Sequence, residues 1–227
     1  MGTAMVRGDA VRSYKFRGSR ITAGQADARA RFWPRYGVPV DGIPLDLPEL
    51  FGRLAPTVLE IGFGMGEATA AMAEAQPDRD LLAVDVHAPG QGALMRLLDQ
   101  RALTNVRVLD GDALVVLREM LPPASLDAVR VFFPDPWPKR RHEKRRLVDA
   151  AFADLVADRL GPGGRLHVVT DLPAYATQVR RVLTGHPAFE LADRVPWRPR
   201  TRFEDQAITA GRPSNDLVAV RRSTAGP

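Results

Sequence analysis

The sequence predicts an α/β fold in which seven strands form one mostly parallel sheet with helices on both faces. The first observation is an alternation of short apolar runs, typical of buried strands, with helical segments that can serve as crossovers in a parallel sheet. The second is that no helical segment separates the last two runs, so we expect the final strand to be antiparallel. Strands are expected at residues 57–63, 80–86, 106–112, 126–133, 165–171, 190–195 and 216–222.

Helical segments fill most of the intervals between these strands. A glycine cluster after the first strand leads into a helix that reaches about Gln76, and the second strand is followed by a helix to about Ala102. Another helix precedes the strand at 126–133. A helix from Ala150 to Leu160 is expected to stop at the GPGG sequence of residues 161–164, which is a strong helix-breaking signal.

Length and composition favour a single domain. The chain has 227 residues, 45% of them hydrophobic, which is enough for one sizeable core. We expect this domain at residues 25–222, with a basic, flexible arm at 1–24 and a disordered tail at 223–227. The absence of cysteine excludes disulfides, thiolate metal ligands and a cysteine nucleophile, and we expect no metal site. Without an apolar signal region or a membrane span, a cytoplasmic protein with no membrane partner is expected.

The net positive charge of the chain is concentrated in one segment. Residues 139–146, KRRHEKRR, carry six basic side chains against the single acid Glu143, and the resulting +5 equals the formal net charge of the whole chain. Clustered charge of this kind favours a polyanionic partner, and nucleic acid before a membrane. The alternative is an ordinary solvated face.

A proline-rich turn, FFPDPWP at residues 132–138, precedes this basic segment. Its three prolines fix φ and lack a backbone N–H, so Asp135 and Trp137 are held on a backbone with few alternative conformations. A carboxylate can accept hydrogen bonds from the N–H groups of a planar heterocycle, and an aromatic face can stack on its ring. The turn therefore indicates a site for a nucleic acid base, with an ordinary turn and a core indole as the alternative.

The first predicted strand leads into the sequence EIGFGMG. Its glycines, Gly62, Gly64 and Gly66, allow the backbone to pass close to a ligand. The acid Glu67 at the start of the following helix would repel a dinucleotide pyrophosphate. The GxGxG spacing after Glu60 instead suits a nucleoside whose tail is an amino acid with a cationic sulfonium.

Two further acids end the next two predicted strands. Asp85 follows Gly66 by nineteen residues, about where a carboxylate would bind both ribose hydroxyls. Asp112 could accept a hydrogen bond from the adenine amino group. Each acid could equally cap a helix, but acids at successive strand ends along one crevice together favour a nucleoside cofactor.

These motifs together resemble those of the bacterial tRNA (guanine-N7-)-methyltransferase family. The resemblance is carried by EIGFGMG, DVHAPG, GDA, FFPDPWPKRRHEKRR, TDLPAY and RPRTRFE, and it extends from about residue 12 to residue 222. It implies a Rossmann-like class I methyltransferase fold and S-adenosyl-L-methionine as the cofactor. It also implies that the substrate is tRNA, methylated at N7 of a guanine in the variable loop to give 7-methylguanosine.

The resemblance also implies roles for individual residues. The cofactor site is assigned to Glu60, Gly62, Gly64, Gly66, Asp85, Asp112 and Asp135, and Asp135 is in addition the catalytic residue. Substrate contacts are assigned to Lys139, Asp171, Thr201, Arg202, Phe203 and Glu204. RNA contacts are assigned to Arg141, His142, Lys144, Arg145 and Arg146. The chain departs from the family pattern at Asp85, where Glu is usual, at Glu143, where a histidine or basic residue is usual, and at Arg202, where lysine is common.

Guanine N7 carries an in-plane lone pair and no proton, so its methylation needs alignment and charge relief, not a strong general base. Asp135 can supply that relief by accepting guanine N–H groups, and Lys139 can hold a phosphate. For Asp171 we leave open whether it orients the base or caps a helix. Two other classes are weighed: a small-molecule N-methyltransferase, which has no use for the basic segment, and an RNA-binding module, which would not need the cofactor acids. The sequence leaves open whether the protein is a monomer or a homodimer.

Overall fold

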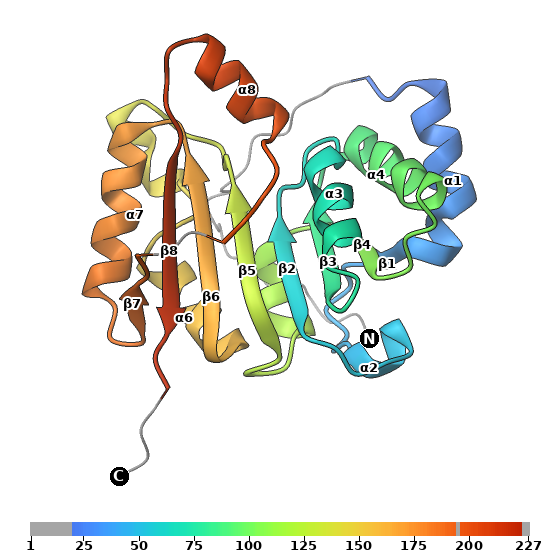
Figure 1. Ribbon diagram of the computed structural model, residues 1–227, viewed down its shortest axis with the longest axis horizontal. Coiled ribbons are helices and arrows are strands. Elements are labelled where there is room, and N and C mark those ends of the chain that lie inside the picture. The colour runs from blue at the N-terminus through green and yellow to red at the C-terminus, as the bar shows by residue number, and fades with distance from the viewer. Residues whose placement is uncertain (1–19, 194–195, 224–227) are drawn as a thin grey trace, which may run out of the picture.

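The computed structural model describes residues 20–193 and 196–223 and contains one eight-stranded sheet, in the order β1-β4-β3-β2-β5-β6-β8-β7 (Figure 1). The six strands from β1 to β6 run parallel to one another, and β8 runs antiparallel to both β6 and β7. The α/β fold and its antiparallel C-terminal strand are confirmed. The strands are β1 (Gly37–Pro39), β2 (Thr57–Ile61), β3 (Asp80–Asp85), β4 (Val106–Asp110), β5 (Leu126–Phe132), β6 (Leu160–Thr170), β7 (Phe189–Leu191) and β8 (Asn215–Arg221).

The predicted number of seven strands is wrong because β1 was missed. This edge strand has only three residues and includes Pro39, so it shows neither an apolar run nor an alternating pattern. It pairs with β4, where Val38 lies opposite Leu109. Its position depends on this tertiary pairing.

Two expectations about connections are also wrong. A helix, α8 (Arg202–Thr209), separates β7 from β8, although its polar sequence gives no apolar stripe of useful length. The second concerns residues 161–164: the helix before them, α6 (Ala150–Arg159), ends within one residue of its predicted end, but these residues belong to β6, which begins at Leu160 and not at 165. They form an irregularity in the pairing of β6 with β5, and Gly163 has a φ of 76° that favours glycine.

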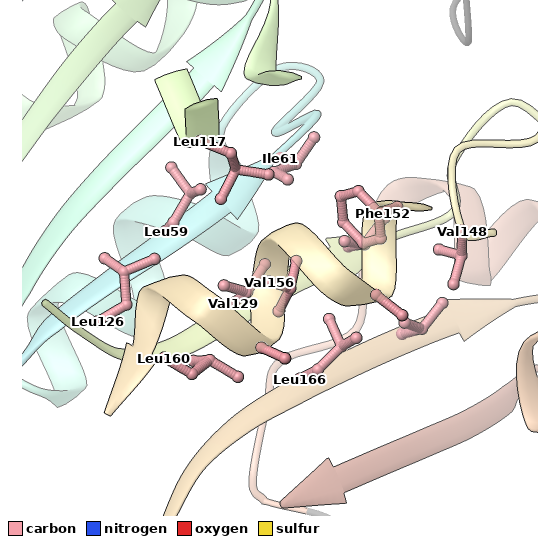
Figure 2. Packing of buried hydrophobic residues seen from close by; sticks show 14 of the residues in the cluster. Leu59, Ile61, Leu117, Leu126, Val129, Val148, Phe152, Val156, Leu160 and Leu166 are labelled. Atoms are coloured by element: carbon pink, nitrogen blue, oxygen red, sulfur yellow. The ribbon is translucent and has the colours of Figure 1, made fainter. Parts of the chain in front are cut away.

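The helices cover both faces of the sheet, as predicted. One face carries α1 (Ala23–Tyr36), α3 (Glu67–Ala75) and α4 (Ala88–Gln100), whose apolar side chains form one core cluster with β2, β3 and β4. The other face carries α5 (Ala113–Val115) with the π-helical turn η1 (Val116–Met120), α6 (Ala150–Arg159) and α7 (Pro173–Gly185). There Phe152 and Val156 of α6 pack against β2, β5 and β6 (Figure 2). The short helix α2 (Leu47–Phe51) lies at the edge where β2 begins (Figure 1).

The first described helix, α1, starts at Ala23 and is capped by Thr22, two residues before the expected start of the domain at 25. Most of the N-terminal arm, residues 1–19, and residues 224–227 of the tail lie outside the described residues. The arrangement that matters for function is the edge of the sheet where the parallel strands end. The glycine turn, Asp85, Asp112, the proline-rich turn and Asp171 all follow strands at this edge, which is where ligands bind in open α/β sheets.

Candidate active site

The glycine turn connects β2 to α3. Gly62, Gly64 and Gly66 have φ values of 80°, 60° and 84°, in the left-handed region that other residues rarely adopt. A Cβ atom on Gly62 would meet nothing within 4 Å, so the backbone is open to a ligand there. On the other side, a Cβ atom on Gly90 of α4 would lie 1.9 Å from the Gly64 carbonyl oxygen, so α4 packs directly against the turn.

Glu60 lies just before this turn and is 3% exposed. Burial raises the pKa of its carboxyl to about 7, although the positive charge of Arg130 acts in the opposite direction. Among the described residues, its Oε2 atom has no hydrogen-bond partner. A buried carboxyl with an open acceptor beside a bare backbone turn fits a cationic ligand group.

Asp85 lies at the end of β3, next to the glycine turn. Its two carboxylate oxygens accept hydrogen bonds from the backbone N–H groups of Gly64, at 3.2 Å, and His87, at 3.0 Å. Burial raises the pKa of this carboxyl, and the two backbone donors partly offset that effect. The carboxylate thus joins the ends of β2 and β3, and each oxygen retains a lone pair for a further donor.

Asp112 caps α5, because its Oδ1 atom accepts a hydrogen bond from the Leu114 N–H at 2.8 Å. The capping alternative is therefore realised in the structure. The side chain is half-buried and its second carboxylate oxygen is not used by this cap, so a role in ligand binding stays a prediction.

A buried hydrogen-bond network next to Asp85 was not predicted from the sequence. Gln91 of α4 is fully buried and donates hydrogen bonds to the Asp85 carbonyl oxygen, at 2.8 Å, and to the Asp110 carboxylate, at 2.7 Å. Arg29 of α1 donates to Gln91, at 2.7 Å, and to Asp110, at 2.6 Å. These contacts join residues up to 81 positions apart, and no local pattern signals them.

The proline-rich turn after β5 has a constrained backbone. Phe133 and Trp137 have positive φ values of 49° and 40°, which are unfavourable for bulky residues and indicate stored strain. The Trp137 indole is 6% exposed, meets His142 edge-on and lies under the Arg145 guanidinium, 4.9 Å from its ring centroid. Of the two alternatives for Trp137, the structure therefore favours the core indole. Asp135, between these residues, is half-buried.

Arg146 does not belong to the surface on which it was predicted. It is 3% exposed and donates hydrogen bonds to the Pro136 carbonyl oxygen, at 3.2 Å, and to Oε1 of Gln178 on α7, at 2.8 Å. Its guanidinium also lies over the Tyr175 ring. Direct contact with RNA does not fit this placement; instead, the side chain ties the proline-rich turn to α7.

The other cations of the segment point outward from a short 3₁₀ helix, η2 (Arg140–Arg145). His142 is half-buried against Trp137. The exposed basic residues, which we call the basic surface, are Lys139, Arg140, Arg141, Lys144 and Arg145. The basic surface therefore begins four residues after Asp135.

At the end of β6, Asp171 is half-buried and accepts a hydrogen bond from Arg212 at 2.9 Å. Asp171 does not cap the helix that follows, because α7 has no side-chain cap; it holds the segment that follows α8, and a role in orienting the base stays a prediction. Thr201 caps α8 by accepting from the Glu204 N–H at 3.1 Å. This Thr-x-x-Glu spacing is a helix start signal that could have revealed α8 in the sequence.

The exposed side chains of α8 include Arg202 and Phe203, whereas Glu204 is buried. The Phe203 ring lies near the glycine turn: a Cβ atom on Gly64 would be 3.5 Å from its Cε2 atom. The structure thus brings α8 to the turn after β2, although about 140 residues separate them in sequence. Asp135, which follows β5, and Asp171, which follows β6, lie along the same edge of the sheet as the glycine turn.

Comparison with known proteins agrees with this arrangement. Residues 54–217 match the family Methyltransf_4, described as "Putative methyltransferase". The tRNA (guanine-N(7)-)-methyltransferase of Streptomyces avermitilis is 57% identical over 93% of this chain and 75% of its own length, and that of Nitrosospira multiformis is 46% identical over 95% and 96%. The chain belongs to the tRNA (guanine-N(7)-)-methyltransferase family.

Solved structures show the methyltransferase fold. The aminoglycoside resistance methyltransferase NpmB1 aligns with a TM-score of 0.55 at 17% identity, covering 78% of this chain and 92% of its own. TrmN from Thermus thermophilus aligns with a TM-score of 0.54 at 21% identity, covering 77% of this chain and 47% of its own. Within the described part of this methyltransferase, no helix is long and apolar enough to cross a membrane, and no cluster of His, Asp and Glu could hold a metal ion.

Proposed function

We propose that this methyltransferase transfers a methyl group from S-adenosyl-L-methionine to N7 of a guanine in the variable loop of tRNA, in the cytoplasm. The observation that carries the proposal is the junction at the end of β5. A half-buried carboxylate, Asp135, sits on a strained turn, and the exposed basic surface starts four residues later. A site for one base and a surface for a phosphate backbone are thus part of the same segment.

The residues of the glycine turn fit the cofactor. The open acceptor of Glu60 and the bare backbone at Gly62 would hold the cationic amino acid tail. Asp85 would accept from the ribose hydroxyls and Asp112 from the adenine amino group. When bound, S-adenosyl-L-methionine supplies an electrophilic methyl group on its sulfonium.

On the substrate side, Asp135 would accept hydrogen bonds from the N–H groups of guanine. Methylation at N7 leaves a positive charge on the ring, and a fixed carboxylate in a partly water-excluded site stabilises that charge as it develops. No general base is needed because N7 carries no proton. Lys139, exposed beside the turn, would bind a phosphate of the target nucleotide, and Arg202 another.

The proposal is tested by incubating the protein with methyl-labelled S-adenosyl-L-methionine and unmodified tRNA transcripts, followed by nuclease mapping of the label. We expect one 7-methylguanosine in the variable loop. A transcript with adenosine in place of that guanosine should remain unlabelled. Label on free guanosine or GTP but not on tRNA would favour a small-molecule methyltransferase, and tRNA binding without any label would favour an RNA-binding module.

A further inference from the structure

Residues 196–201 lead into α8 (Figure 1). Arg198, in this segment, turns its side chain toward the sheet and leaves only 9% of it exposed. Its guanidinium contacts two carboxylates. It donates to Asp216 of β8 through Nε and Nη2, both at 2.8 Å, and to Glu204 of α8 through Nη1 and Nη2, at 2.5 and 3.0 Å.

The surroundings of Arg198 connect three strands to the helix. His167 of β6 donates to Asp216 at 2.8 Å, and Ser214 donates to Glu204 at 2.7 Å. The Arg198 guanidinium also lies 5.5 Å from the ring centroid of Phe132, the last residue of β5. Phe132 in turn meets His167 edge-on.

The charges of this cluster stabilise one another. Burial alone would raise the pKa of the Asp216 carboxyl, but hydrogen bonds from His167 and Arg198 outweigh it and hold that pKa well below its usual range. The hydrogen bonds from Arg198 likewise lower the pKa of Glu204. Both carboxylates therefore stay ionised at neutral pH, and a bidentate arrangement of this kind is geometrically specific to arginine.

The cluster fixes the first turn of α8 in two ways. The Glu204 side chain is bound by Arg198, and the Glu204 N–H donates to the Thr201 cap. The residue before Glu204, Phe203, lies near the glycine turn: its Cε2 atom is 3.5 Å from where a Cβ atom on Gly64 would be. A change in the direction of this turn would therefore move Phe203 and Thr201 relative to the cofactor site.

We propose that Arg198 is a positioning residue for methyl transfer: by binding Glu204 and Asp216 together, it holds the first turn of α8 against the glycine turn. It acts through α8 and does not touch the reacting atoms. The inference rests on the proposed function, because it assumes that the substrate base is held between α8 and the proline-rich turn.

The test compares Arg198→Gln and Arg198→Lys with Arg180→Ala, an exposed arginine on α7. A misplacement of about 1 Å can cost about 100-fold in rate, so we expect kcat for tRNA methylation to fall roughly 10- to 100-fold in both Arg198 variants. The dissociation constant of S-adenosyl-L-methionine should change by less than about threefold, because the acids of the cofactor site are untouched, whereas that of tRNA can rise by the one phosphate contact assigned to Arg202. Arg180→Ala should behave like the wild type.

A second measurement does not depend on activity. Trypsin can cleave after Arg202, which is exposed on α8, once the helix opens locally. We expect faster cleavage at this bond in Arg198→Gln, by a larger factor than its loss of global stability accounts for, because Glu204 and Asp216 lose their arginine partner. Wild-type kcat in both variants, or a loss of cofactor binding in proportion to the loss of activity, would overturn the inference. A wild-type protein that leaves tRNA unmethylated would instead overturn the proposed function, and the cleavage rates would still decide whether Arg198 holds α8.

Discussion

The two halves of the candidate site are positioned by different means. In the cofactor half, at the ends of β2 and β3, the backbone does most of the positioning: three glycines adopt left-handed φ values, and Asp85 is bound by backbone N–H groups. In the substrate half, the proline-rich turn and α8 lie outside regular strands and are held by the buried side chains of Arg146 and Arg198. A regular strand end needs little support, whereas an irregular segment needs long-range contacts to adopt one conformation.

This difference predicts two classes of variant. Substitutions in the cofactor half should mainly change cofactor affinity and leave the substrate half intact. Substitutions of the buried arginines should change the shape of the substrate half, and with it stability or rate.

The largest effect is expected for Asp135→Ala. Loss of one preorganised electrostatic contact typically lowers the rate by about 100-fold or more, and the half-buried turn position should let the fold survive. Single-turnover methylation of tRNA measures the effect. Asp135→Asn keeps an acceptor oxygen without the charge, so its methylation rate should lie between those of the wild type and Asp135→Ala. Near wild-type turnover in Asp135→Ala would remove the catalytic assignment.

Arg146→Ala should destabilise the protein more than Arg141→Ala, although both residues belong to one basic sequence. Removing Arg146 leaves the half-buried Pro136 carbonyl and the Gln178 side-chain oxygen without their donor, which should lower the free energy of unfolding by about 1–3 kcal/mol. Arg141 is exposed, so its replacement should change that free energy by less than about 0.5 kcal/mol. Urea denaturation compares the two. Equal stabilities would show that the turn does not depend on Arg146.

Asp85→Ala tests the cofactor half. Loss of charge-assisted hydrogen bonds to the ribose should weaken S-adenosyl-L-methionine binding by about 1.5–3 kcal/mol, with tRNA affinity unchanged. Calorimetry with each ligand measures both. Asp85→Glu restores the residue usual in the family and serves as the control. If Asp85→Ala binds the cofactor as well as the wild type, the ribose is held elsewhere.

The basic surface should account for the salt dependence of tRNA binding. Each phosphate contact contributes about 0.7–0.9 to the slope of log affinity against log salt, so the triple variant Arg141→Ala, Lys144→Ala, Arg145→Ala should flatten that slope by about two units. Cofactor affinity should be unaffected. An unaltered slope would identify these side chains as an ordinary solvated face.

The smallest effect is a pH dependence of cofactor binding through Glu60. Because burial raises the pKa of this carboxyl to about 7, it gains a proton as the pH falls through that value, and a neutral carboxyl attracts a cationic ligand less. S-adenosyl-L-methionine affinity should therefore fall about tenfold between pH 8 and pH 6. Glu60→Gln should bind more weakly at pH 8 and lose this dependence. The same pH dependence in Glu60→Gln would point to another group.

The sequence by itself determined where the long strands lie along the chain, the acids at their ends and the glycine turn. These features depend on local periodicity and backbone preference. The sequence could not predict that Arg145 is exposed while Arg146 is buried, or that Arg198 is buried between two carboxylates. The burial of an arginine depends on which distant side chains face it. Gln178 lies 32 residues from Arg146, and Asp216 lies 18 residues from Arg198. The three-residue strand β1 and the position of α8 likewise depend on contacts with distant residues. Short or polar segments gain their stability from contacts with the folded sheet, and those contacts form only in the tertiary structure.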